Sequence, residues 1–146
     1  MLIGHTISRA DRVEDDRFIY NSWLKTLADE LQIDRNDVER FRTFTRQMRP
    51  TLVALRTNKA TQTFVVHATG DRDELHAWLC AEPPSILHFI YTRSCWRKRG
   101  FARALSERAG MGSSVRASHY TTYGFPRVMR LYDELEFDPT YLLAER

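Results

Sequence analysis

The sequence has little of several features that mark whole classes of protein. Only two of its 146 residues are cysteines, Cys80 and Cys95, too few for a disulfide framework or a thiolate zinc site. No apolar run approaches the roughly 18–20 residues that a membrane span needs. The N-terminal residues 1–16 become charged too early for a signal peptide. We therefore expect a soluble, cytoplasmic protein with reduced cysteines, no metal site and no membrane partner.

The composition is sufficient for a single folded core. Hydrophobic residues make up 42% of the chain, which excludes wholesale disorder, and 146 residues is the length of one domain. The sequence contains no internal repeat, low-complexity stretch or linker that would divide it. We therefore predict one domain over residues 1–146 and expect a monomer or a homodimer.

Lysine is also scarce, because 19 of the 22 basic residues are arginine. Residues 93–130 contain nine basic residues and one acid, Glu107, whereas the chain turns acidic after Leu131. Guanidinium groups bind phosphate in a bidentate way, so this stretch favours a polyanionic ligand, either a nucleic acid or a phosphorylated cofactor. A solvated basic face without a ligand is the plain alternative.

Two helices are predicted in the first half of the chain. Apolar residues recur at three- and four-residue steps from Asp15 to about Leu31, which is typical of an amphipathic helix. A second helix is expected to begin at Asn36, an N-cap residue with Glu39 three positions later, as in a capping box. Pro50 should end or kink this helix. Residues 51–56 fit either a further helical turn or a short strand.

The second half alternates between strand and helix patterns. The run Ile86–Thr92 is apolar on both faces apart from His88 and Thr92, as expected for a strand in the middle of a sheet. The predicted elements are strands at Thr63–Ala68, Glu74–Ala81 and Ile86–Thr92, a helix at Phe101–Ala109 stopped by Gly110, a strand at Val115–Thr122, a helix at Arg127–Glu136 and a last strand at Phe137–Leu143. This order predicts an α/β (α+β) sandwich around one mixed sheet.

The loop between the 86–92 strand and the 101–109 helix favours an anion site. Backbone N–H groups at the start of a helix lack partners, and with the helix dipole they bind phosphates. Gly100 allows a ligand to approach the backbone closely, Ala102 keeps the first turn slim, and Arg97 adds a full positive charge. The local chemistry therefore favours a pyrophosphate, although an ordinary glycine near a helix start gives the same spacing.

The same residues resemble the motif of a known family. The strand Ile86–Thr92, followed by Arg97-x-x-Gly100-x-Ala102, is similar to the acetyl-coenzyme A (acetyl-CoA) motif of the Gcn5-related N-acetyltransferases. Residues 131–137, Leu-Tyr-Asp-Glu-Leu-Glu-Phe, resemble the late helix of that family. The resemblance spans nearly the whole chain. It implies a three-layer sandwich, with a central mixed sheet flanked by helices, and an acyltransferase that acetylates an amine.

The resemblance also implies roles for individual residues. The pyrophosphate of acetyl-CoA would be held by Arg97, Lys98, Arg99, Gly100, Phe101 and Ala102, and the pantetheine arm by Ile90, Tyr91 and Thr92. Tyr132 would be the general acid that reprotonates the departing thiolate. The general base is not fixed by the motif, and His88, His119 and Glu82 are the candidates. The acceptor amine belongs to a small molecule, a protein or a nucleobase.

Other interpretations stay open. Each histidine has a structural role as its alternative, and Tyr132 lies on an apolar stripe where it would simply pack. A nucleic-acid-binding or nucleic-acid-modifying protein is the second hypothesis, with Trp96, Tyr120 and Tyr123 available to stack on bases. The third is a catalytically degenerate acyl-CoA-binding protein, because Phe125 stands where the family commonly has asparagine.

Overall fold

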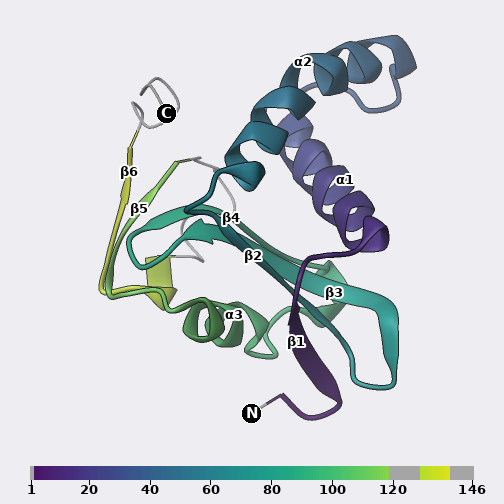
Figure 1. The fold of residues 1–146 in the computed structure, drawn as a ribbon. Helices are drawn as coiled ribbons and strands as arrows, with labels where there is room; N and C mark the ends of the chain where they lie inside the picture. Colours follow the sequence, from purple (N-terminus) through teal and green to yellow (C-terminus); the bar gives the residue numbers. More distant parts are fainter. Residues whose placement is uncertain (1, 119–128, 139–146) are drawn as a thin grey trace.

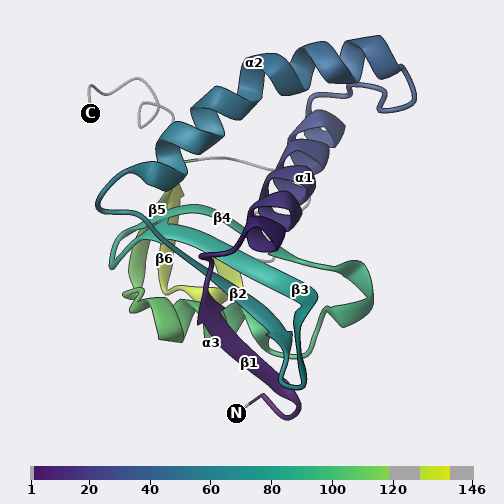
Figure 2. The same ribbon diagram turned by 45° about the vertical axis from the view of Figure 1, so that its right-hand side comes forward.

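One mixed β-sheet separates two groups of helices (Figures 1 and 2). The computed structural model describes residues 2–118 and 129–138 of the chain. Within them the elements follow in the order β1 (His5–Arg9), α1 (Val13–Glu30), α2 (Val38–Thr57), β2 (Gln62–Ala68), β3 (Asp71–Glu82), β4 (Ile86–Thr92), η1 (Ser94–Trp96), α3 (Phe101–Ala109), β5 (Ser114–Ala117), η2 (Met129–Leu131) and β6 (Glu134–Phe137).

The order of strands in the sheet follows their order in the chain, from β1 to β6. Strands β1 to β4 pair antiparallel, whereas β5 pairs parallel with both β4 and β6. Helices α1 and α2 cover one face of the sheet and α3 covers the other (Figure 1). This arrangement confirms the predicted α/β sandwich of three layers, and β4 lies in the sheet interior as expected.

Alternation along the strands divides the core between the two faces. On the α1–α2 face the rings of Trp23, Trp78 and Phe89 lie with centroids 5.2–5.5 Å apart. The indole N–H of Trp78 donates to the hydroxyl of Ser22 at 2.7 Å, so this buried donor is satisfied. The cluster on the α3 face includes Phe64, Leu79, Leu87, Phe101 and Leu105. Burying each such side chain contributes about 1.5–3 kcal/mol.

Helix α1 confirms the prediction for residues 15–31, with a start two residues earlier and an end one residue earlier. The carboxylate of Asp15 accepts from the backbone N–H of Arg12 at 3.2 Å. It also accepts two hydrogen bonds from the guanidinium of Arg72, at 2.9 and 2.7 Å. The start of α1 is thereby tied to the start of β3, and the buried charge of Asp15 is paired.

Helix α2 differs from its prediction at its start. Its N-cap is Asp37, whose side chain accepts from the backbone N–H of Arg40 at 3.2 Å, and not Asn36. The helix does not end at Pro50 but continues to Thr57, so residues 51–56 form the further helical turn that was one of their two alternatives. The last turns are held by tertiary packing, because Leu52 and Leu55 are 0% and 8% exposed in the α1–α2 core. Burial here outweighs the backbone hydrogen bond that a proline removes.

Strand β1 was not predicted from the sequence. It pairs antiparallel with β2 along its whole length, from His5 opposite Ala68 to Arg9 opposite Phe64. It is the edge of the sheet and is only partly buried, so it has neither a continuous apolar run nor a clear alternation. Ile7 is its single large apolar residue, which explains why the periodic pattern was absent.

The predicted helix at 127–136 is wrong. Its described part forms the single turn η2 and then strand β6, which pairs parallel with β5. Tyr132 and Leu135 are buried on the α3 face, as a helix would also bury them, but they reach it from a turn and a strand. The predicted strand at 115–122 is present as β5, while residues 119–122 and most of the expected 137–143 strand lie outside the described residues.

Candidate functional site

The loop from β4 to α3 exposes the backbone donors that the sequence predicts. Strand β4 and helix α3 have the predicted bounds, with residues 93–100 between them. Within the described residues, the N–H groups of residues 98–102 donate to no acceptor. Gly100 is the N-cap of α3 at φ +81°, and Lys98 lies at φ +64°. Left-handed residues in such a loop turn successive N–H groups toward one side, as in anion-binding nests.

The loop is anchored from below by backbone bonds and ring packing. The N–H of Arg93 donates to the carbonyl of His76 at 2.9 Å, and the N–H of Trp96 donates to the carbonyl of Arg93 at 2.8 Å. The Trp96 ring packs on His5, His76 and Phe101, with centroids 5.0, 4.1 and 6.2 Å away. Three elements, β1, β3 and α3, therefore hold the loop in place, which pre-organises its free donors.

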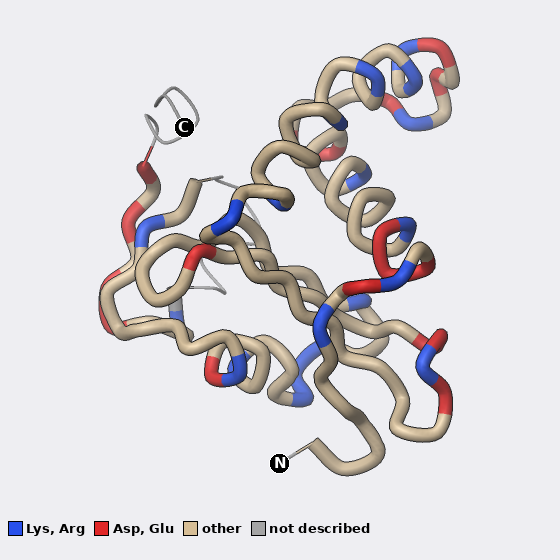
Figure 3. The backbone as a smooth tube through the Cα atoms, in the orientation of Figure 1, with Lys and Arg blue, Asp and Glu red and all other residues tan. Residues whose placement is uncertain are grey.

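Positive charge surrounds these donors (Figure 3). Arg97, Lys98 and Arg99 are all exposed, and in the described part of the chain none forms an ion pair. Arg97 donates through Nε to the carbonyl of Thr92 at 3.1 Å, and the guanidinium of Arg99 lies 4.6 Å above the Trp96 ring. The helix dipole of α3 adds partial positive charge at the same place. This end of α3 is suited to a doubly charged anion.

Beyond its first residues, β4 has a free edge toward β5 in the described structure. The two strands pair only at Ile86 and Leu87, and the N–H of Ser118 adds one further bond to the carbonyl of Leu87 at 3.0 Å. Residues 89–92 continue to pair with β3 on the other side. Ile90, Tyr91 and Thr92 are half-buried along this edge, which leads directly to the anion loop. An extended ligand can therefore use backbone groups there.

Three buried polar side chains meet at the point where β4 and β5 separate. The Nδ1 of His88 lies 2.7 Å from the hydroxyl of Ser118, and its Nε2 lies 2.9 Å from Oε2 of Glu82. Two of the base candidates are thus brought together, from β4 and from the end of β3. The third candidate, His119, lies outside the described residues. Sequence reasoning did not identify Ser118, because a lone serine at the end of a strand gives no signal.

Tyr132 is placed against α3. Its hydroxyl lies 2.7 Å from that of Ser106, and its side chain belongs to the buried cluster of the α3 face. Burial raises the pKa of Tyr132, while the hydrogen bond with Ser106 partly opposes this rise. The phenol therefore keeps its proton at neutral pH, as a general acid must. The described contacts do not join Tyr132 to His88.

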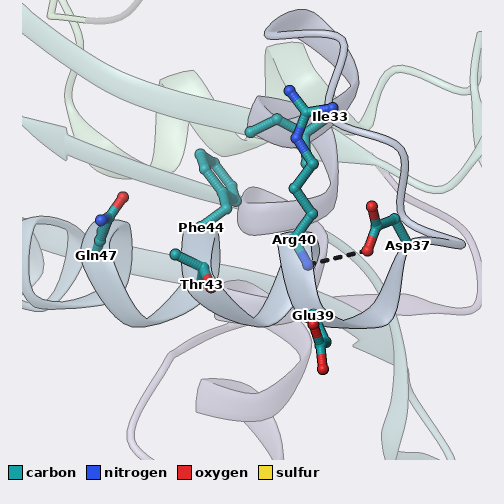
Figure 4. Close-up of a pocket in the computed structure, with 7 residues that line it drawn as sticks. All are labelled: Ile33, Asp37, Glu39, Arg40, Thr43, Phe44 and Gln47. Carbon is teal, nitrogen blue, oxygen red and sulfur yellow. Dashed lines mark hydrogen bonds between the residues drawn. The ribbon is translucent and has the colours of Figure 1, made fainter.

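A depression lies at the start of helix α2, on the α1–α2 face of the sheet (Figure 4). Its lining residues are Ile33, Asp37, Glu39, Arg40, Thr43, Phe44 and Gln47. The one hydrogen bond drawn there is the N-cap bond of α2, from Arg40 to Asp37. Its polar groups serve the start of the helix, and we assign no site to it.

The described residues contain neither a membrane-spanning helix nor a metal-binding cluster. No helix among residues 2–118 and 129–138 is long and apolar enough to cross a membrane. The same residues contain no group of three or more His, Cys, Asp or Glu side chains that could hold a metal ion.

Comparison with known proteins gives structural but not sequence matches. No family model and no curated protein matches the chain. Aminoglycoside 6′-N-acetyltransferase AAC(6′)-Ih from Acinetobacter baumannii is similar over 87% of both chains, with 16% identity and a TM-score of 0.48. The ribosomal-protein-alanine N-acetyltransferase of Brucella melitensis biovar Abortus 2308 is similar over 95% of this chain and 85% of its own, with 13% identity and a TM-score of 0.43.

A third similar structure is the aminoglycoside acetyltransferase meta-AAC0020 from an uncultured soil metagenomic sample, solved in complex with trehalose. It matches over 98% of this chain and 91% of its own, with 10% identity and a TM-score of 0.45. All three are acetyltransferases, the class that the sequence resembles. At these identities and scores, a function has to be argued from the residues of the site.

Proposed function

We propose that the chain is an acetyl-CoA-dependent N-acyltransferase of the Gcn5-related kind, which acetylates an amine. One observation supports this proposal above all others. Among residues 2–118 and 129–138, the N–H groups of 98–102 at the start of α3 donate to no acceptor, and β4, which leads into this loop, pairs with β5 only at Ile86 and Leu87. A diphosphate and an extended amide-containing arm, joined to each other, match these two features in that order along the chain.

The residues of the loop would bind the donor. The N–H groups of 98–102 would donate to the diphosphate, and the side chains of Arg97, Lys98 and Arg99 would neutralise its charge. Residues 90–92 would pair with the pantetheine arm as a further strand does. When bound, acetyl-CoA supplies an activated acyl group as a thioester. The protein then has to orient an amine, accept its proton and donate a proton to the leaving sulfur, which requires only a few side chains.

The buried polar groups would manage those protons. His88 would serve as the general base for the acceptor amine, because its imidazole lies where β4 and β5 separate. Tyr132 would hold a proton for the leaving sulfur; burial raises its pKa, which keeps the phenol protonated and also makes it a weaker acid. Positioned proton transfer of this kind contributes about 10²–10⁴-fold to the rate. His119 remains a candidate base outside the described residues.

The nucleic-acid hypothesis receives less support. The ring of Trp96 packs against three other rings beneath the loop, so its face is not free to stack on a base. Tyr120 and Tyr123 lie outside the described residues. We propose acetyl-CoA as the polyanion that the basic stretch binds, and leave the acceptor as an amine of a small molecule, a protein or a nucleobase.

Two glycines of α3 provide a matched test of donor binding. Gly100 and Gly110 flank the helix at φ +81° and +79°, and neither has an atom within 4 Å of a built Cβ. Alanine at either position costs roughly 1 kcal/mol of backbone strain. Only Gly100→Ala places a methyl group among the free N–H donors. We expect calorimetry to show acetyl-CoA affinity falling about tenfold or more for Gly100→Ala and unchanged for Gly110→Ala.

The result of this titration is decisive for the proposal. Wild-type protein that fails to bind acetyl-CoA would remove the proposed function. Equal losses in the two variants would mean that strain in α3, and not contact with the ligand, lowers the affinity.

A second test addresses Tyr132. Tyr132→Phe should lower kcat about 10²-fold or more while the acetyl-CoA affinity stays within a few-fold. Ser106→Ala is the control, because it breaks the same hydrogen bond, whose two oxygens lie 2.7 Å apart, and retains the phenol. Turnover should persist in Ser106→Ala. Full activity in Tyr132→Phe would assign the residue to core packing.

A further inference from the structure

The contacts of His88 determine which of its nitrogens has a proton. Glu82, His88 and Ser118 are 8%, 2% and 3% exposed, so bulk water does not settle the question. The carboxylate of Glu82 can only accept, and its Oε2 lies 2.9 Å from Nε2, close enough for charge attraction although the two atoms do not meet hydrogen-bond geometry. A lone pair on Nε2 would face this negative charge, so the neutral ring is more stable with its proton on Nε2. The lone pair is then on Nδ1, and the hydroxyl of Ser118, 2.7 Å away, has to donate to it.

This arrangement has a consequence for catalysis. The basic atom of His88 is occupied by a protein hydroxyl, so an acceptor amine does not reach it directly. Ser118 is the residue immediately after β5, and its N–H bonds to Leu87, the last β4 residue that pairs with β5. Its hydroxyl therefore lies where the two strands begin to separate.

We propose that Ser118 is a catalytic residue that relays the proton of the acceptor amine to His88. This inference rests on the proposed N-acyltransferase function and deepens it. As the amine nitrogen bonds to the acyl carbon, its proton passes to Oγ of Ser118, whose own proton passes to Nδ1 of His88. The carbon–sulfur bond breaks, and its electron pair leaves on sulfur, which takes a proton from Tyr132. Ser118 ends unchanged, His88 ends as an imidazolium beside Glu82, and Tyr132 ends as a phenolate; loss of a proton from His88 to solvent and uptake of one by Tyr132 restore the starting state.

Glu82 has a different part in this scheme. It touches neither the amine nor the donor, and acts as a positioning residue through His88. Its carboxylate fixes the proton on Nε2 and stabilises the imidazolium that forms. The three side chains come from β3, β4 and the end of β5, so the relay exists only in the folded sheet.

The first experiment observes the ring in the folded full-length chain. Nitrogen-15 NMR of labelled histidine, with the His88 signals assigned by comparison with His88→Gln, should show a protonated Nε2 and an unprotonated Nδ1. In Ser118→Ala the Nδ1 signal should move toward that of a lone pair without a hydrogen bond. A ring protonated at Nδ1 in the wild type would overturn the relay, whatever the acceptor amine.

The second experiment measures turnover with defined amines. Thiol release from acetyl-CoA is followed with spermidine, an aminoglycoside and alanine amide as acceptors. Ser118→Ala should lower kcat about 10²-fold with an unchanged KM for acetyl-CoA, while Ser118→Thr, which keeps the hydroxyl, should stay within a few-fold of wild type. A proton inventory in mixed H₂O and D₂O should report two protons in motion in wild type and one in Ser118→Ala.

The two proposals fail in different ways. Equal rates for Ser118→Ala and wild type would overturn the relay and leave the N-acyltransferase function intact. Absence of turnover by the wild type with every amine, together with absence of acetyl-CoA binding, would overturn both.

Discussion

Two histidines, His76 and His88, are buried to nearly the same degree but lie in opposite chemical surroundings. They are 3% and 2% exposed. Both also occupy bulges, because the pairing of β3 with β2 skips His76 and the pairing of β4 with β3 skips His88. A bulge releases a residue from the ladder and re-aims its side chain. The two residues therefore have similar backbone positions, and they differ in the side chains that each ring contacts.

The ring of His88 meets polar groups on both sides, Ser118 and Glu82. The ring of His76 meets other rings, those of His5, Trp96 and Phe101, at centroid distances of 5.2, 4.1 and 6.5 Å. Neither nitrogen of His76 forms a hydrogen bond in the described structure, and its Nε2 lies 3.6 Å from Oε1 of the exposed Glu74.

The comparison shows that burial alone does not give a histidine its function. Burial lowers the pKa of His76; Glu74 opposes this with the next-largest effect, and His5 and Arg93 lower the pKa further. His76 therefore remains neutral at neutral pH and packs among aromatic rings next to the anion loop. His88 has a carboxylate that would stabilise an added proton and a hydroxyl that would deliver one. In our proposal, the same residue type is a packing element at one bulge and a proton carrier at the other.

The comparison is tested most strongly by replacing each histidine with leucine and comparing the two losses of stability. His88→Leu removes the imidazole that lies 2.9 Å from the buried carboxylate of Glu82, and should lower the free energy of unfolding by about 3 kcal/mol. His76→Leu removes no hydrogen bond, and should lower it by about 1 kcal/mol or less. Urea unfolding of both variants at pH 7.5 measures the difference.

A double variant sharpens the result. Adding Glu82→Gln to His88→Leu removes the buried charge, and should restore a large part of the lost stability. If His76→Leu proves as damaging as His88→Leu, then the 3.6 Å contact of His76 with Glu74 stabilises the fold as much as the contact of His88 with Glu82, and the contrast between the two histidines is wrong.

The sequence predicted the fold best where one element is surrounded by others. Strand β4 and helix α3 were predicted with their bounds. The strand is buried on both faces and gives a continuous apolar run, and the helix is buried on one face and gives a helical periodicity. Strand β1 was missed, since an edge strand needs few apolar residues. The 127–136 helix was wrong because Leu131 and Leu135 fit a helical spacing, while parallel pairing with β5 buries Leu135 from a strand.

The candidate site was predicted in part for the same reason. The anion loop is a local feature, so Gly100 and the arginines beside it were visible in the sequence. His88 was visible as a polar residue inside an apolar strand. Ser118 and the pairing of Glu82 with His88 arise from the register of three strands and from two bulges, which single-sequence patterns do not encode. The aromatic packing of His76 likewise depends on a bulge in β3, so no sequence pattern indicated it.

The smallest effect that we predict concerns pH. The pKa of His76 is lowered in the folded protein from its ordinary value of 6.5, so just below pH 6.5 the unfolded chain binds this proton more readily than the folded chain does. Stability due to this residue is complete above pH 6.5 and is lost as the pH falls below it. Urea midpoints at pH 7.5 and 5.5 should therefore fall more for wild type than for His76→Leu. Identical falls in the two proteins would show that His76 takes up a proton as readily in the folded state, and that its aromatic surroundings do not exclude charge.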